Sequence, residues 1–160
     1  MRVTIVDTLR AVSLLVERTF GEAPTTKDIH EGFDRPCSYV QPILIDSEKS
    51  GGLIMDRYEI QIIRFATRSE TGYLELLQWQ EALRDALEEP VAVYTEDTIV
   101  DGATVPGTAS DFFLYPEDIS YSLDRDDMAL VVSFTVENVQ PYEEPDDGSE
   151  TMTELELKNV

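Results

Sequence analysis

The chain has 160 residues, of which 42% are hydrophobic and 9% aromatic, which fits one domain with a core of its own and argues against a wholly disordered chain. Thirty-three acidic residues against twelve basic ones give a formal net charge of −21. A protein so poor in lysine and arginine repels the phosphates of duplex DNA, so the composition disfavours a DNA-binding protein.

A single cysteine, Cys37, excludes an internal disulfide. The N-terminal stretch carries Asp7, Arg10, Glu17 and Arg18, which interrupt the apolar core that a signal peptide needs. The sequence also lacks an apolar run of membrane length. We therefore expect a protein that is made and kept in a cytoplasm, without contact to a membrane.

The first predicted element is a helix that begins after Thr4. Thr4 and Asp7 have the spacing of a capping box, in which two side chains cover free backbone N–H groups. Gly21 and Pro24 are expected to end the helix. Between these ends, apolar residues recur at spacings of three and four and form one stripe, made of Ile5, Leu9, Val12, Val16 and Phe20.

Two strands are predicted after a polar connecting segment. Pro36 favours an extended conformation at Arg35 and opens a first strand over residues 37–45. Pro42 within this strand lacks an N–H donor, which predicts an edge strand or a bulge. A polar loop over residues 46–52 leads to a second strand over residues 53–66, in which apolar and polar residues alternate. The two strands are expected to pair antiparallel.

A second helix is indicated by another apolar stripe, which ends before Pro90 and consists of Tyr73, Leu76, Leu77, Leu83 and Leu87. Three more strands are predicted in "VAVYT", "DFFLYP" and "DMALVVSFTVENV", and residues 101–110 are interpreted as a connecting segment rich in glycine and proline. The expected fold class is α+β, with two helices packed on one face of a mostly antiparallel sheet in the order α-β-β-α-β-β-β.

The acidic residues are concentrated near the C-terminal end, where residues 137–160 hold eight acids and one lysine. We divide the chain into an α+β domain over residues 1–138 and an acidic C-terminal extension over residues 139–160. One interpretation of the extension is a solvated tail. The other is a segment that adds a strand or docks on a neighbouring subunit through Met152, Leu155 and Leu157.

No sequence pattern indicates a catalytic, cofactor or metal site. His30 and Cys37 lack the motif that surrounds a Cys–His nucleophile, and a packed cysteine is the simpler interpretation. The acidic segment 124–127 lacks the spacing of a calcium-binding loop and is better explained as a polar turn. Glycine-rich phosphate loops are missing from the sequence as well. We therefore expect no enzyme, no cofactor and no bound metal.

The stretch "IHEGFDRPCSYVQPIL" resembles the early signature of a phage tail terminator family found in tailed phages and prophages. Gly32, Phe33, Pro36 and Val40 match the turn that follows the N-terminal helix in that family and opens its first strand. The segments "RYEIQIIRFA" and "LLQWQEALRDAL" resemble the second strand and the helix behind it. The similarity covers residues 1–137, while Cys37 and Ser38 depart from the pattern.

This resemblance implies a structural virion protein of the tail–neck region that is assembled in the host cytoplasm. Copies of such a protein form a homo-oligomeric ring, usually a hexamer, on the end of the tail tube nearest the head. The ring ends polymerisation of the tail tube protein and meets the head-tail connector or head-closure protein. DNA passes through the ring without specific binding, and acidic lumen walls would repel its phosphates. Ordinary solubility is the alternative explanation of the charge.

The resemblance also suggests candidates for the subunit interface. Phe33 is expected to act as an apolar anchor, and the neighbouring Asp34 and Arg35 are expected to point outward. The remaining candidates are basic residues that could pair with acids of a neighbouring copy, namely Arg57, Arg64 and Arg68. Surface solvation is the alternative explanation for each charge.

Three other functions remain open at this stage. The chain could be another neck, head-closure or tail-completion component. It could also be an adaptor domain whose acidic surface mimics nucleic acid and occupies a basic partner. A small hydrolase is the third alternative.

Overall fold

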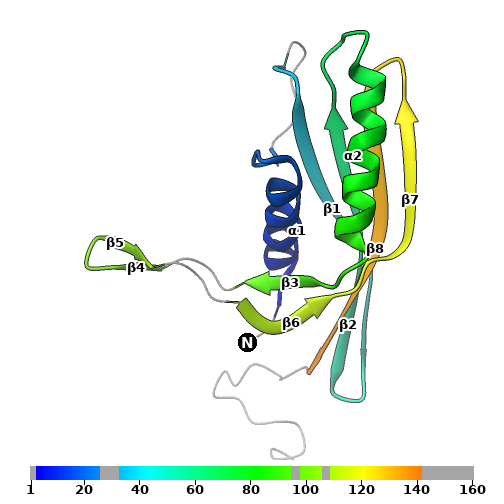
Figure 1. Cartoon of the computed structure of the whole chain (residues 1–160). Coiled ribbons are helices and arrows are strands. Elements are labelled where there is room, and N and C mark those ends of the chain that lie inside the picture. The colour runs from blue at the N-terminus through cyan, green and yellow to red at the C-terminus, as the bar shows by residue number, and fades with distance from the viewer. Residues whose placement is uncertain (1–2, 26–32, 95–97, 106–108, 142–160) are drawn as a thin grey trace, which may run out of the picture.

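The computed structural model describes residues 3–25, 33–94, 98–105 and 109–141. Four strands form an antiparallel sheet in the order β1-β2-β8-β7, and both helices lie on one side of it (Figure 1). The pairs β3–β6 and β4–β5 form two separate two-stranded sheets. The elements are α1 (Ile5–Phe20), β1 (Cys37–Ser50), β2 (Leu53–Phe65), α2 (Gly72–Leu87), β3 (Val91–Tyr94), β4 (Thr98–Val100), β5 (Ala103–Val105), β6 (Ala109–Leu114), β7 (Glu117–Asp124) and β8 (Ala129–Pro141).

The predicted order α-β-β-α-β-β-β is wrong, although the broad α+β class fits. In the described residues, α2 is followed by six strands. Part of the predicted connecting segment forms the β4–β5 hairpin, whose turn residues Asp101 and Gly102 have φ angles of 51° and 79°. Strands of three residues are too short to show a period in the sequence.

Strand β7 was also missing from the prediction. Ile119, Tyr121 and Leu123 are half-buried on this strand and alternate with exposed residues. Its first residues, Glu117 and Asp118, follow Pro116 directly, so this part of the sequence has the composition of a polar connection. The sheet therefore gains an edge strand that local composition concealed.

The ends of α1 confirm the predicted caps. Thr4 and Asp7 form a capping box, in which the Asp7 backbone N–H donates to the Thr4 hydroxyl and the Thr4 N–H donates to the Asp7 carboxylate. Gly21 ends the helix in the left-handed conformation, with φ 79°. The buried side of α1 contains Val12 and Val16, which belong to the predicted apolar stripe.

The β1–β2 hairpin is longer than predicted, because β1 continues to Ser50. The turn consists of only Gly51 and Gly52, at φ 58° and 77°, so most of the predicted loop over residues 46–52 is strand. The pairing register shifts between Leu44 and Asp46, which places a bulge at this point of β1. Pro42 lies on an edge strand, as predicted.

The core lies between the helices and one face of the sheet. Side chains alternate between the two faces of a strand, and on β2 and β8 the even-numbered positions are buried. From the opposite side, α1 contributes Val12 and Val16, and α2 contributes Leu76 and Leu83. The fully buried positions of the two central strands include Ile60, Ile62, Leu130, Val132 and Phe134.

Polar residues close the core where α1 begins. Asn138 and Gln140 are buried on β8, and their side-chain amide groups donate to the backbone carbonyl of Val3 at 2.9 and 2.8 Å. The Val3 N–H donates in turn to the Gln140 side chain. These bonds attach the start of α1 to the end of β8, which continues to Pro141. Residues 142–160 of the predicted acidic extension lie outside the described residues.

The position of Phe134 predicts its contribution to stability, because its side chain is 1% exposed. We expect Phe134→Ala to lower the free energy of unfolding by about 3–5 kcal/mol, since the buried ring is lost and a cavity remains. Phe113 is 46% exposed and provides a matched control. Phe113→Ala should cost about 1 kcal/mol or less in the same urea titration. Equal losses for the two variants would contradict this location of the core.

Candidate assembly surfaces

The sheet face turned away from the helices carries acidic side chains. The odd-numbered positions of β2 and β8 lie on this face, and it includes Glu59 and Glu137. The pairing register adds residues of the edge strands at neighbouring positions, namely Asp46 and Glu48 of β1 and Glu117 of β7. No described helix covers this face, so the carboxylates stay accessible to solvent and give the face a negative potential (Figure 1).

Arg57, one of the predicted interface residues, lies on this acidic face. Its guanidinium is 3.8 Å from the Asp118 carboxylate of β7, and the two side chains are 45% and 76% exposed. An ion pair between such exposed groups contributes little to stability. Arg57 therefore reduces the negative charge of the face at one place and remains accessible to another molecule.

Arg64, a second predicted interface residue, lies inside the subunit and is only 3% exposed. Its position on β2 has the same parity as Ile60 and Ile62, so it points toward the helices. The guanidinium carbon lies 4.7 Å from the ring centre of Phe20 and 4.5 Å from that of Trp79. This cation therefore joins α1, α2 and β2 by contacts with two aromatic rings.

Two polar groups complete the surroundings of Arg64. Its Nη1 donates to the Ser38 hydroxyl at 2.9 Å and lies 3.7 Å from the Glu22 carboxylate. Burial lowers the pKa of the Arg64 guanidinium, and the charge of Glu22 raises it. Arginine keeps its proton in proteins, so the site holds a permanent positive charge in an otherwise apolar layer.

The predicted turn around Phe33 is held by cation–aromatic contacts. Phe33 packs on Phe65 of the same subunit, with 4.7 Å between the ring centres. The Arg35 guanidinium lies over both rings, at 4.9 and 5.2 Å. It also donates to the backbone carbonyls of Ala66 and Asp127, at 3.1 and 2.6 Å. The expected outward orientation of Arg35 is therefore wrong, while Asp34 is exposed.

The acidic segment 124–127 is a polar turn between β7 and β8, as the sequence favoured. The Asp124 carboxylate accepts the backbone N–H groups of Asp126 and Asp127 at 3.0 and 3.2 Å. Arg68, an exposed interface candidate, donates to the Asp126 carbonyl at 2.9 Å. Among the described residues, no cluster of three or more His, Cys, Asp or Glu side chains could hold a metal ion.

Cys37 is a free, half-buried cysteine at the start of β1. Burial raises the pKa of its thiol, and the nearby Arg64 and Arg35 oppose this effect. A raised pKa is the reverse of what activates a nucleophilic cysteine, so the geometry fits the interpretation as a packed residue. His30, the other member of the pair considered from the sequence, lies outside the described residues.

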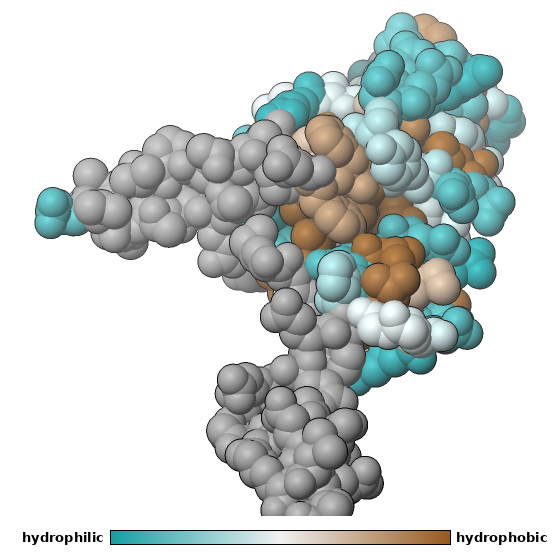
Figure 2. All heavy atoms as spheres, turned by 90° about the horizontal axis from the view of Figure 1, so that it is seen from below, coloured by the Kyte–Doolittle hydropathy of each residue, from teal (hydrophilic) through white to brown (hydrophobic). Residues whose placement is uncertain are grey.

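Hydrophobic side chains are exposed at the end of the molecule opposite the β7–β8 turn. Seen from that end, they gather in the middle of the surface, with hydrophilic residues around them (Figure 2). Phe113, Tyr115 and Val139 border a groove there, together with Glu117 and Glu137. The β1–β2 hairpin, which extends beyond the helices in Figure 1, adds exposed Ile43, Leu44, Ile45 and Leu53. Exposed apolar groups in such number are typical of a protein-binding surface.

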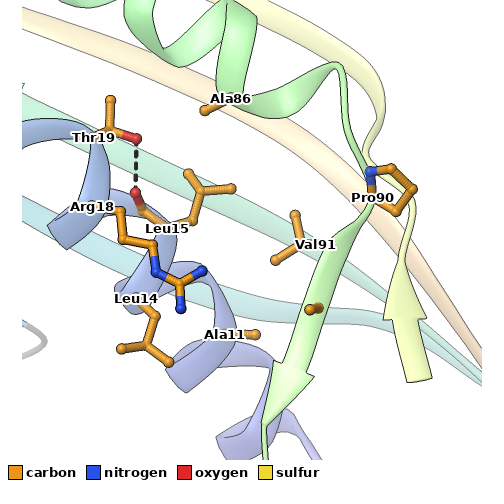
Figure 3. A pocket seen from close by; sticks show the side chains of 9 residues that line it. Ala11, Leu14, Leu15, Arg18, Thr19, Ala86, Pro90 and Val91 are labelled. Carbon is orange, nitrogen blue, oxygen red and sulfur yellow. Dashed lines mark hydrogen bonds between the residues drawn. The ribbon is translucent and has the colours of Figure 1, made fainter. Parts of the chain in front are cut away.

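A second depression, which we call the helix cleft, lies between α1, α2 and β3 and has a volume of about 240 Å³ (Figure 3). The Thr19 hydroxyl donates to the Leu15 carbonyl at 2.7 Å, so this polar group is satisfied within α1. Arg18 adds a cation to the cleft. The other lining residues are mostly apolar: Ala11, Leu14, Leu15, Ala86, Pro90, Val91 and Ala92.

Sequence reasoning missed both hydrophobic surfaces. Leu14 and Leu15 lie next to the apolar stripe of α1, and the periodicity gives no sign that β3 leaves a gap beside them. The buried position of Arg64 could have been found, because the parity of β2 places it on the same side as Ile62.

Comparison with known families agrees with the resemblance found in the sequence. A family model described as phage tail terminator protein matches residues 7–126, which is three quarters of the chain. The chain therefore belongs to this family of viral structural proteins of the bacteriophage tail. No curated protein matches the chain. Among the described residues, no helix is long and apolar enough to cross a membrane.

The surroundings of Arg64 generate a prediction about this buried cation. We expect Arg64→Lys to lower the free energy of unfolding by about 1–2 kcal/mol, because an ammonium group cannot stack flat between two rings. Trp79, the only tryptophan, reports on the same site, and its fluorescence emission should shift to the red. Arg84 has a side chain that is 61% exposed, so Arg84→Lys serves as the control. Unchanged stability and emission in Arg64→Lys would contradict a role for the stacked guanidinium.

Proposed function

We propose that this member of the phage tail terminator family forms a closed ring, a hexamer, that caps the tail tube at its head-proximal end. The ring ends polymerisation of the tail tube protein and provides the tail side of the junction with the head-closure protein. It acts in the neck region of the virion and assembles in the host cytoplasm. Family membership supports the terminator role, and the open acidic face of the sheet is the observation that carries the ring geometry.

In the proposed ring, the acidic sheet face of each copy borders the central channel. Glu59 and Glu137 then line the path of the DNA, whose phosphates they repel. A channel that let DNA adhere would slow its passage, so a wall without accessible cation clusters suits transport. Physiological salt screens charges beyond about 8 Å, which confines this repulsion to DNA close to the wall.

The hydrophobic surfaces suit contacts with proteins of the tail. Leu53 and Val139 are 47% exposed and lie near the groove that Phe113 and Tyr115 border. These groups lie at one end of the sheet, which in the ring becomes one of its two end faces. We assign this end to contact with the tail tube protein, since a stable cap needs apolar area that is buried on docking. Asp34, Arg57 and Arg68 remain interface candidates at the surface.

The proposed function requires no catalytic group. The ring would act by shape and by self-association, and its partners are other copies, the tube protein and the head-closure protein. Substrate turnover that is lost on Cys37→Ala would contradict a purely structural role.

A second candidate function is an adaptor that mimics nucleic acid. The acidic sheet face favours it, because regularly spaced carboxylates could occupy a basic partner. Such a protein would stay small and bind its partner with strong salt dependence, whereas a terminator closes into rings on the tail tube. Another neck or tail-completion protein is a related alternative.

Virus particles assembled without this protein test the terminator role directly. We expect overlong tails and heads without attached tails, because nothing stops growth of the tube or joins it to the head. Negative-stain electron microscopy measures tail length, and restoring the intact gene provides the control. Tails of normal length on filled heads would overturn the proposal.

The channel assignment has a separate test with charge-reversed protein. We expect Glu59→Lys combined with Asp46→Lys to leave tail length normal but to slow DNA release, because the new cations bind phosphates. The control combines Glu81→Lys with Glu89→Lys, two exposed positions at α2 with the same change in charge. The measurement is the rate of DNA release from purified particles at low and high salt. Equal rates for both variants would contradict the channel assignment.

A further inference from the structure

We propose that the β4–β5 hairpin of one copy docks into the helix cleft of the next copy and thereby links the subunits of the ring. This inference rests on the proposed function, because it assigns a surface to the self-association that a ring requires. Residues 98–105 of one copy are the inserted part, and the cleft between α1, α2 and β3 of the next copy is the acceptor.

The hairpin is separated from the main sheet. Its strands pair with each other and with no other described strand. In Figure 1 it extends sideways from the body, away from the two helices. A single two-stranded hairpin is only marginally stable in water, and this one is rich in apolar residues: Ile99, Val100, Ala103 and Val105. Its separation from the main sheet and its apolar composition therefore favour a protein surface that covers it.

The helix cleft has the size and chemistry to receive the end of such a hairpin. Its volume of about 240 Å³ can take an apolar side chain of the hairpin, since about 150 Å³ accommodates a benzene-sized group. Leu14, Leu15 and Ala92 are half-buried in its lining, so apolar area remains to be covered. The close-up shows Leu14 and Leu15 of α1 and Val91 of β3 at this depression (Figure 3).

The charges at the two surfaces are opposite. Asp101 is exposed at the hairpin turn, and Arg18 lies in the cleft lining. In a chain of net charge −21, two copies repel each other at most relative orientations. A contact that brings a carboxylate of one copy to an arginine of the next selects one orientation among these.

The direction of the hairpin agrees with the proposed ring. The open sheet face and the helices are on opposite sides of the sheet, while the hairpin extends sideways from the body (Figure 1). If the sheet faces the channel, the helix cleft faces outward and the hairpin reaches along the circumference to the neighbour. The two surfaces differ, so copies join head to tail, and a suitable rotation closes them into a ring.

Cysteine cross-linking on assembled tails tests this contact. The only natural cysteine is first removed by Cys37→Ser, and Asp101→Cys is then combined with Leu14→Cys in the full chain. A short bismaleimide should give a ladder of covalent multimers in denaturing gels. The matched control replaces Leu14→Cys by Ser133→Cys, on the open sheet face, and should leave at least tenfold more monomer. Cross-links within one chain or to the tube protein would overturn the proposal, as would equal ladders in both variants.

A charge exchange provides a second test that needs no new cysteine. We expect Arg18→Glu and Asp101→Lys each to lower the fraction of chains in rings about tenfold at low salt. The double variant should recover most of the loss, because the attraction is restored with reversed sign. Circular dichroism on each variant checks that the fold is intact. If the double variant loses as much ring formation as the two single variants together, the contact is contradicted.

These outcomes separate the contact from the proposed function. Overlong tails without the protein, together with absent cross-links and additive charge effects, would leave the terminator role standing and reject the hairpin contact. Normal tails without the protein would reject the terminator role itself.

Discussion

The alternation of side chains along β2 and β8 is the constraint on which the rest of the structure depends. Even positions hold most of the apolar residues that the helices cover. Odd positions hold Glu59, Glu137 and other polar groups, together with apolar residues such as Ile63, Phe65 and Val131. A chain with a net charge of −21 must keep most of its carboxylates in water, because burial of an unpaired charge is very costly. The buried Asp56 is an exception that accepts hydrogen bonds from Ser47 and Tyr58. The two-sided sheet meets this requirement and produces the acidic face as a consequence. Core formation and the proposed channel wall therefore have one physical origin.

Arg64 shows how the same alternation can place a charge in the core. Its parity directs it under the helices, where Phe20 and Trp79 enclose the guanidinium and Ser38 and Glu22 provide oxygen atoms. Arginine suits this position because its planar, weakly hydrated cation stacks on aromatic rings. The arrangement positions α2 against α1, and the walls of the helix cleft depend on that relation. A residue predicted at the subunit edge thus supports the proposed assembly surface from inside the subunit.

The sequence predicted the parts of the fold that local signals determine. The capping box at Thr4, the left-handed Gly21 and the alternation in β8 led to elements that the structure contains. The β4–β5 hairpin and β7 were missed, because short strands and acidic composition resemble a connection. The helix cleft was beyond prediction, since it arises from tertiary packing between segments distant in the chain. The acidic face could be predicted only in part. The alternation along each strand assigns its acids to one side, but only the pairing register shows which acids of different strands are neighbours.

A strongly acidic protein that associates with copies of itself must overcome repulsion between them. Uniform apolar contact would permit many orientations, whereas a chain with few basic residues can match charges at only a few places. Arg64 and Arg35 are engaged within the subunit, and Arg57 contacts Asp118. In the proposed contact, Arg18 is the cation that meets the neighbouring copy. An apolar insertion with one opposite charge beside it, as at the helix cleft, combines attraction with orientation. Scarcity of positive charge therefore suits the proposed ring better than unspecific aggregation, since each copy offers few compatible contacts.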